Sequence, residues 1–176
     1  RLLLTRGGRR LLLTEPLPSQ PETARLSAVT YAPTRILTGA KSLSYAANML
    51  AGRIARERGF DEALLVTPHG RAIEAPTSSL FWADADGRLS TPPLGDHVLA
   101  SITRRHLLEL LDVRERSIAL DELVDVATEA FLASTVREVQ PVSAIDEREL
   151  AAPGPLTEAA ADAFAAHRDE LLRRGE

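Results

Sequence analysis

Lys41 is the residue whose type most narrows the chemistry this sequence could do. It is the only lysine among 21 lysine and arginine residues, and all the others are arginine. A GC-rich genome accounts for the arginines but leaves the one lysine unexplained. Arginine keeps its proton near neutral pH, whereas a buried lysine can lose it, and only a neutral primary amine attacks a carbonyl to form an imine. Composition alone leaves a catalytic role and chance retention both open.

The position of Lys41 favours a functional role. It directly follows Thr38-Gly39-Ala40, where an extended segment is expected to end. Apolar residues at helical spacing predict a helix over 41–58, and Gly59 is a natural stop. A lysine at the start of a helix has the wrong charge for the helix dipole, so a purely structural reason for it is weak.

Glu74 is the second candidate functional residue. It ends a predicted strand over 71–74 and precedes Pro76, the hydroxyl-rich run Thr77-Ser78-Ser79 and an apolar strand over 80–83. One interpretation is an edge carboxylate followed by an ordinary turn. The functional interpretation is a carboxylate that faces a cavity lined by hydroxyl groups.

Two further hydroxyl-bearing segments could hold an anion. Ser101-Ile102-Thr103 opens a predicted helix over 101–111, and the free N–H groups at a helix start bind anions such as phosphate. Ser134-Thr135 lies between predicted strands over 129–133 and 138–143 and could add donors to the same anion. Serine and threonine are also common caps and turn residues, so neither segment is specific alone.

Several other classes of function lack their signatures. The absence of cysteine excludes disulfides, thiolate nucleophiles and cysteine-based metal sites, and fits a reducing, cytoplasmic location. No two histidines have metal-ligand spacing, and neither a Walker loop nor a Gly-x-Ser-x-Gly elbow occurs. A formal net charge of −4 gives little support for nucleic-acid binding, and no apolar run is long enough to cross a membrane. No secretory signal is visible.

The pattern of elements predicts one mixed α/β domain over residues 1–176. Its 44% hydrophobic and 26% charged residues are typical of a soluble globular chain. Hairpins rather than a regular βαβ series disfavour a plain doubly wound fold. Besides the elements above, the expected strands and helices are a hairpin of 2–5 with 11–14, extended segments 27–31 and 35–37, strands 63–67, 88–90 and 114–118, and helices 121–124 and 157–174.

Taken together, these segments resemble the large domain of the class IV (fold type IV) pyridoxal-phosphate enzymes. That family includes branched-chain and D-amino-acid aminotransferases and 4-amino-4-deoxychorismate lyase. The resemblance runs from about Leu11 to Leu171 and implies the D-amino-acid aminotransferase-like fold, with a barrel-like mixed sheet and packed helices. The similar segments are Lys41-Ser42-Leu43-Ser44-Tyr45, Glu74 through Phe81, Ser101-Ile102-Thr103-Arg104, and Ala133-Ser134-Thr135 with Glu138 through Pro141-Val142.

The resemblance implies a role for each candidate residue toward pyridoxal 5'-phosphate. Lys41 would hold the cofactor as a Schiff base and then move protons, and Glu74 would keep the pyridine nitrogen protonated. Leu99 would pack against the ring, and Tyr45 would reach its hydroxyl. Ser78 and Ser79 would lie close to cofactor or substrate. The residues implied for the phosphate are Ser101, Ile102, Thr103, Ser134 and Thr135.

The sequence departs from the family pattern in three ways. Ser79 stands where many relatives have asparagine, and Ser101 where many have glycine. The third departure is the small N-terminal domain of the family, which is missing together with a phosphate-gripping arginine and much of the substrate pocket. Because the chain begins with Arg1 rather than methionine, we expect it to belong to a longer protein whose start is encoded elsewhere or is missing from this sequence. The family also implies a homodimer.

Three functions remain open from the sequence. The first is an aminotransferase acting on a small apolar, branched-chain-like amino acid and a 2-oxo acid. The second is 4-amino-4-deoxychorismate lyase, which releases pyruvate to give p-aminobenzoate, and Leu80-Phe81-Trp82 slightly resembles the lyase members. The third is a non-catalytic remnant, against which the retention of Lys41 and Glu74 argues. The residues that separate the two reactions lie mostly in the missing part.

Overall fold

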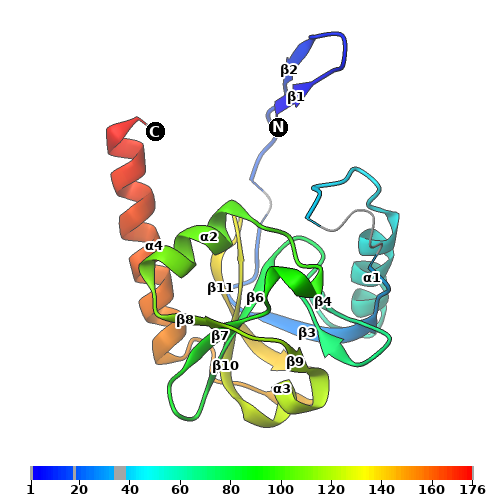
Figure 1. Ribbon diagram of the computed structural model, residues 1–176, viewed down its shortest axis with the longest axis vertical. Coiled ribbons are helices and arrows are strands. Elements are labelled where there is room, and N and C mark those ends of the chain that lie inside the picture. Colours follow the sequence, from blue (N-terminus) through cyan, green and yellow to red (C-terminus); the bar gives the residue numbers. More distant parts are fainter. Residues whose placement is uncertain (1, 18, 34–38, 176) are drawn as a thin grey trace.

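A ten-stranded mixed sheet forms the centre of the computed structural model, which describes residues 2–17, 19–33 and 39–175 (Figure 1). Its strands are β3 (Ala24–Thr30), β4 (Glu62–Val66), β5 (Arg71–Ala72), β6 (Ser79–Asp84), β7 (Leu89–Thr91), β8 (Val113–Glu115), β9 (Ile118–Ala119), β10 (Ala127–Ser134), β11 (Glu138–Ile145) and β12 (Arg148–Glu149). Their order is β8-β7-β6-β10-β11-β3-β4-β5-β9, with β12 paired to β11.

Strand directions confirm the mixed sheet. The pairs β11–β3, β3–β4 and β7–β8 are parallel, and the other neighbours in the sheet are antiparallel. The sheet therefore contains hairpins as well as crossovers, in agreement with the predicted mixed α/β domain. This arrangement puts β6 directly beside β10, so the start of β6 meets the end of β10.

The strands in the middle of the sheet are buried on both faces. In β6, Leu80 and Trp82 pack into one hydrophobic cluster, while Phe81 and Ala83 pack into another on the opposite face. Alternate side chains of a strand point to opposite faces, so a continuous apolar run marks a strand covered on both sides. Phe81 stacks on Phe131 of β10 with ring centroids 4.8 Å apart.

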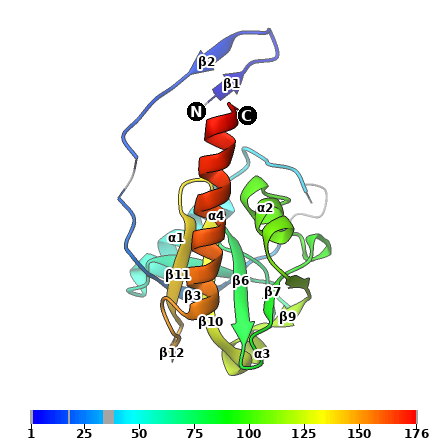
Figure 2. The ribbon, with the colours of Figure 1, turned by 90° about the vertical axis from the view of Figure 1, so that its left-hand side faces the viewer.

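Helices supply the covering layers. Helix α1 (Ala46–Glu57) lies against β3 and β4 through Ala51 and Ala55, and α3 (Leu120–Val126) packs beside β5 and β9. Helices α2 (Ile102–Leu110) and α4 (Pro155–Arg174) contact each other and β10, and their buried Leu107 and Ala160 meet the phenylalanine stack. Figure 2 shows α4 running along the sheet. No helix among the described residues is long and apolar enough to span a membrane.

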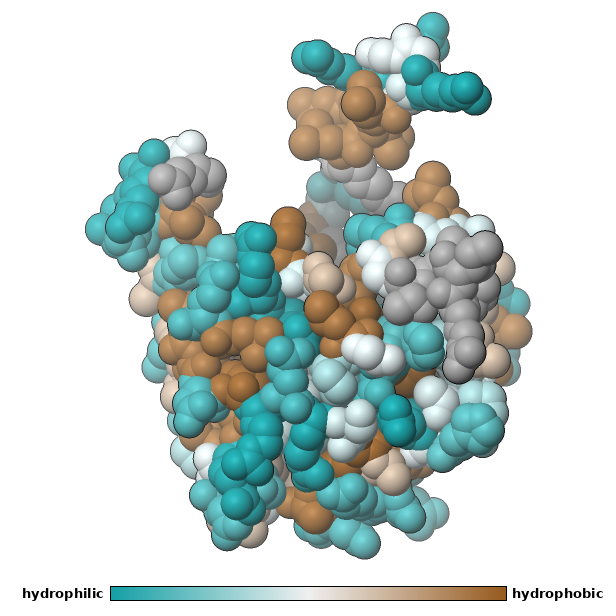
Figure 3. Space-filling model, viewed as in Figure 1, coloured by the Kyte–Doolittle hydropathy of each residue, from teal (hydrophilic) through white to brown (hydrophobic). Residues whose placement is uncertain are grey.

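The predicted hairpin at the start of the chain forms, but it lies away from the sheet. Strands β1 (Leu2–Leu4) and β2 (Arg10–Leu12) pair antiparallel. Its leucines are exposed, with Leu2 at 84% and Leu12 at 72%. In Figure 3 they form a hydrophobic group that stands clear of the main body.

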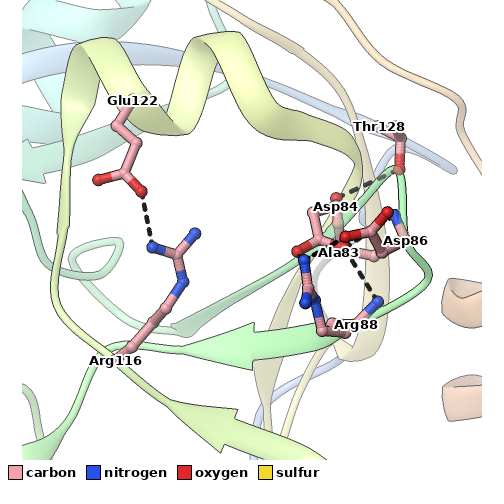
Figure 4. A network of polar contacts seen from close by, with 7 residues as sticks. All are labelled: Ala83, Asp84, Asp86, Arg88, Arg116, Glu122 and Thr128. Atoms are coloured by element: carbon pink, nitrogen blue, oxygen red, sulfur yellow. Dashed lines mark hydrogen bonds and ion pairs between the residues drawn. The ribbon is translucent and has the colours of Figure 1, made fainter.

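The turn between β6 and β7 is held by one carboxylate (Figure 4). Asp84 accepts hydrogen bonds from the amides of Asp86 and Arg88, at 3.0 and 3.1 Å, and pairs with the Arg88 guanidinium. Thr128 donates to the Ala83 carbonyl at 3.2 Å and so ties the end of β6 to β10. Nearby in the same view, Arg116 and Glu122 form an ion pair at 2.7 Å. These contacts hold the last residues of β6, at the opposite end of that strand from the loop 74–79.

Helix α1 begins later than the sequence predicts. It starts at Ala46 rather than at Lys41, with Tyr45 as its N-cap residue. Leu43, whose spacing favoured a longer helix, is 95% exposed and has no core to pack against. The Ser44 amide instead donates to the Ser42 hydroxyl at 3.0 Å, a local bond that competes with helix formation.

The other predicted elements are found with shifted ends. The expected strand over 114–118 is divided into β8 and β9, and the strand predicted over 71–74 keeps only two residues. The expected extended segment 35–37 lies outside the described residues.

A buried carboxylate caps helix α4 and generates a stability prediction. Glu129 on β10 accepts hydrogen bonds from the amides of Leu156 and Thr157, at 3.1 and 2.8 Å, and from the Thr157 hydroxyl at 2.7 Å. Gly154 precedes the helix so closely that an added Cβ would lie 2.8 Å from the Glu129 Cβ.

We therefore expect Gly154→Ala to lower the free energy of unfolding by about 1–3 kcal/mol, because the crowded carboxylate must move. Urea denaturation of the purified chain measures the change. Gly95→Ala is the matched control, since an added Cβ there meets nothing within 4 Å. Equal stabilities of the two variants would contradict the assigned contact.

Candidate active site

Glu74 lies in the connection between β5 and β6, at the edge of the sheet next to α2. Its backbone is fixed by β4, since the Leu65 amide donates to the Glu74 carbonyl at 2.9 Å. Its side chain faces the segment before α2, where the Leu99 amide donates to both carboxyl oxygens, at 3.1 and 3.3 Å. The carboxyl group therefore has a fixed orientation and one backbone donor.

Burial shifts the titration of Glu74 into the neutral range. Desolvation raises its pKa from 4.5 to about 8, while the Leu99 amide and the charges of Arg104 and Lys41 act in the opposite direction. A carboxyl group with such a pKa can hold or release a proton near pH 7.

Lys41 and Tyr45 lie in the loop before α1. Lys41 is exposed, and the Tyr45 hydroxyl donates to the Pro76 carbonyl in the loop that follows Glu74. Asn48 donates to the same carbonyl at 3.3 Å. Burial, and then the negative charges of Glu62 and Glu74, raise the pKa of Tyr45 to about 12. Tyr45 is therefore a neutral hydrogen-bond donor at neutral pH, and it joins the lysine segment to the Glu74 loop.

The first turn of α2 faces the same region. Ser101 is the N-cap residue, and its hydroxyl accepts from the Arg104 amide at 3.1 Å. The amides of Ile102 and Thr103 have no acceptor within the helix, as at the start of any α-helix. Thr103 is buried, whereas the Ile102 side chain is 65% exposed. This turn therefore offers the backbone N–H groups of Ile102 and Thr103 to an anion.

The turn between β10 and β11 lies beside the start of β6, because these two strands are paired in the sheet. Ser79, the first residue of β6, pairs with Ala133 of β10, so Ser134 and Thr135 follow directly beside it. The Ser134 hydroxyl accepts from the Arg137 amide at 3.2 Å, and Thr135 is exposed in the turn. Of the two turn hydroxyls, Thr135 is the one left facing solvent.

Ser78 and Ser79 are both buried but differ in their contacts. The Ser79 hydroxyl lies 3.2 Å from the Ser101 hydroxyl. The Ser78 hydroxyl has no hydrogen-bond partner among the described residues. A buried hydroxyl without a partner is destabilising unless a ligand or water satisfies it.

The structure thus connects several of the candidate residues, whereas Lys41 is exposed and is joined to them only through the segment that ends at Tyr45. Direct hydrogen bonds join Glu74 to Leu99 and Ser79 to Ser101, and Tyr45 reaches the loop between Glu74 and Ser79. One positional expectation is wrong, because Lys41 lies in a loop five residues before α1 and not at a helix start.

Arg104 is a residue of this region that the sequence reasoning did not single out. Its guanidinium is 4% exposed and donates to the Pro92 carbonyl at 2.9 Å and to Glu115 at 2.7 Å. Its Nε has no partner among the described residues. Its charge lowers the pKa of Glu74. An arginine in the first turn of a helix that should bind an anion was the available signal.

Most of the chain matches a known family. The family model described as amino-transferase class IV matches residues 1–145. The chain belongs to the class IV aminotransferase family. This class IV chain is 36% identical over 122 residues to a probable branched-chain-amino-acid aminotransferase of Aquifex aeolicus (strain VF5), covering 65% of this chain and 39% of the relative. It is 32% identical over 141 residues to the branched-chain-amino-acid aminotransferase of Escherichia coli (strain K12), covering 76% and 45%.

Solved structures agree with the family. A fold IV transaminase from Curtobacterium pusillum has a TM-score of 0.77 at 32% identity, covering 89% of this class IV chain and 56% of that chain. The branched-chain amino acid aminotransferase of Thermobaculum terrenum in its PLP form has a TM-score of 0.76 at 32% identity, covering 81% and 50%. The fold is therefore that of the fold type IV transaminases. The chain spans less than half the length of the two curated relatives and about half that of the solved ones.

The titration of Glu74 predicts a pH dependence of stability. Its pKa is about 8 in the folded chain and 4.5 when unperturbed, so the folded state holds one more proton between these values. Stability without cofactor should then fall as pH rises through this window, by at most about 1.4 kcal/mol per pH unit.

Urea denaturation of this class IV chain at several pH values from about 5 to 8 measures this slope. Glu74→Gln should flatten it, because the amide does not titrate. Glu57→Gln changes an exposed carboxylate and should leave it unaltered. A slope that survives in Glu74→Gln would show that another group carries it.

Proposed function

We propose that this chain is the cofactor-binding part of a pyridoxal-phosphate-dependent aminotransferase. Its substrates are a small apolar, branched-chain-like amino acid and a 2-oxo acid. The observation that carries the proposal is the pairing of the partly buried Glu74 carboxyl with the segment that opens α2. Branched-chain-amino-acid aminotransferases among the relatives support the substrate class.

The described residues fit pyridoxal 5'-phosphate by their chemistry. Glu74 is a partly buried carboxyl group, and a protonated pyridine nitrogen beside it would favour its ionised form. The open amides at the start of α2 suit a phosphate group. The Ser78 hydroxyl is buried and without a described partner, so it can bond a polar group of cofactor or substrate. When bound, pyridoxal phosphate supplies an electron sink for the substrate carbanion.

Each residue would then have a role toward the bound cofactor. Glu74 would lie at the pyridine nitrogen, and the charges of Arg104 and Lys41 favour its ionised form. Lys41 would supply the amine that links to the cofactor and would move the proton at the substrate carbon. Leu99 would pack against the ring, and Tyr45, whose hydroxyl donates to the Pro76 carbonyl, would lie near the ring hydroxyl. Ile102, Thr103 and Thr135 would hold the phosphate, with Ser101 and Ser134 beside them.

The lyase alternative has less support from the described residues. Trp82, the residue that favoured it, is fully buried and packs in the hydrophobic core beside Leu80. Packing in the core therefore explains why a tryptophan occurs at this position. Aminotransfer therefore remains the first proposal.

We propose that an N-terminal domain of the same protein and a second copy in a cytoplasmic homodimer complete the site. The exposed leucines of the β1–β2 hairpin and the 95% exposed Leu43, in the segment that holds Lys41, are apolar surfaces that such partners would cover.

Replacing Lys41 tests the proposed chemistry. In the full-length protein, Lys41→Ala should lower leucine–2-oxoglutarate transamination by at least about 10³-fold, because no other described amine can move the proton. Lys41→Arg is the matched control: it keeps the positive charge but cannot release a proton, so it should be equally inactive. Activity retained in either variant would contradict a catalytic lysine.

A parallel assay with aminodeoxychorismate separates the two reactions. We expect no pyruvate in the absence of an amino acceptor. Pyruvate formed under that condition, and lost in Lys41→Ala, would replace the aminotransferase by the lyase.

The 176 residues alone should bind the cofactor weakly. The family resemblance implies a phosphate-gripping arginine and part of the pocket outside this chain. Titration of the isolated chain with pyridoxal phosphate, followed by visible absorbance, should give no tightly bound band. A stoichiometric band at micromolar concentration would contradict this expectation.

A further inference from the structure

Two hydrogen bonds join the segment 99–101 to the loop 74–79. At one end the Leu99 amide donates to the Glu74 carboxyl oxygens, at 3.1 and 3.3 Å. At the other end the hydroxyls of Ser101 and Ser79 lie 3.2 Å apart. The Ser101 amide donates to the Leu99 carbonyl at 2.8 Å, which keeps the short segment compact between the two contacts.

The serine pair connects elements that are distant in sequence. Ser101 caps α2 by accepting from the Arg104 amide, so movement of its side chain would move the first turn of the helix. Ser79 begins β6 and pairs with Ala133 at the end of β10. Ser79 is 3% exposed, so water cannot readily replace a lost partner.

We propose that Ser79 and Ser101 are a pair of positioning residues that hold the start of α2 at a fixed distance from Glu74. The inference rests on the proposed cofactor site. There Glu74 would hold the pyridine nitrogen and the α2 amides the phosphate of the same cofactor, so their separation would determine how well both groups are held. The two hydroxyls act through each other and need not touch cofactor or substrate.

The proposed pair connects the two small departures from the family pattern, Ser79 and Ser101. A glycine at position 101 has no hydroxyl, so it could not make this contact with Ser79. The backbone of Ser101 is extended, with φ −75° and ψ 150°, which any residue adopts without strain. Ser79 and Ser101 therefore form one coupled feature of this chain.

A double-mutant cycle on the full-length protein tests the pair. Ser79→Ala and Ser101→Ala should each raise the dissociation constant for pyridoxal phosphate by about 3- to 10-fold. The double variant should bind no more weakly than the weaker single variant, because the contact is already lost. Ser101→Thr keeps the capping hydroxyl and should restore most of the affinity lost in Ser101→Ala.

Ser90→Ala supplies the matched control, since Ser90 is a buried serine on β7 outside the segment 99–101 and the loop 74–79. Combined with Ser101→Ala, its effect should be additive. Amide hydrogen exchange at Leu99 in the cofactor-free protein gives a second readout. Exchange should accelerate in both single variants, because the neighbouring end of the segment is released.

The outcomes separate the inference from the proposed function. Additive effects of Ser79→Ala and Ser101→Ala would mean independent binding roles and overturn the pair. Lower thermal stability with unchanged cofactor affinity and unchanged Leu99 exchange would overturn it as well. A wild-type protein that binds no pyridoxal phosphate would instead overturn the proposed function, and with it the role of the pair in holding the cofactor.

Discussion

The hydrogen bond from the Leu99 amide to the Glu74 carboxyl group is the interaction on which the candidate site depends. Burial of a carboxyl group is costly unless a donor or a positive charge compensates it. Here one backbone amide and the charges of Arg104 and Lys41 oppose the desolvation, and the pKa still rises to about 8. The group is therefore poised near neutrality and pointed at a fixed place. A cationic ring nitrogen in front of it would complete the compensation.

The sheet provides the rigidity that this arrangement needs. Strands β4 and β6 are buried along most of their length, and β10 is tied to both β6 and β11. Clusters of apolar side chains fill both faces, so the ends of these strands cannot shift without opening a core. The loops that bear Glu74, Ser79 and Thr135 leave this framework at one edge. Rigid strands thereby position residues that belong to loops.

Membership of the class IV family gives these contacts a chemical context. Sequence identity to the solved relatives is about one third, yet the fold is retained over most of this chain. Within this fold, the Ser79–Ser101 contact, the buried Arg104 and the Tyr45–Pro76 contact connect the loop after Glu74 to its neighbouring segments.

The sequence alone determined the residue types and most of the elements. The lone lysine, the carboxylate before a hydroxyl-rich loop and the apolar runs of β6 and β10 depend on local patterns, which periodicity and turn chemistry reveal. The late start of α1 escaped prediction because Leu43 has the right spacing but no core to contact. Only the tertiary structure decided that Leu99 bonds Glu74 and that Ser101 bonds Ser79, across 25 and 22 residues of sequence. Those meetings follow from strand order and from the packing of α2, which are properties of the whole sheet and cannot be read from any one segment.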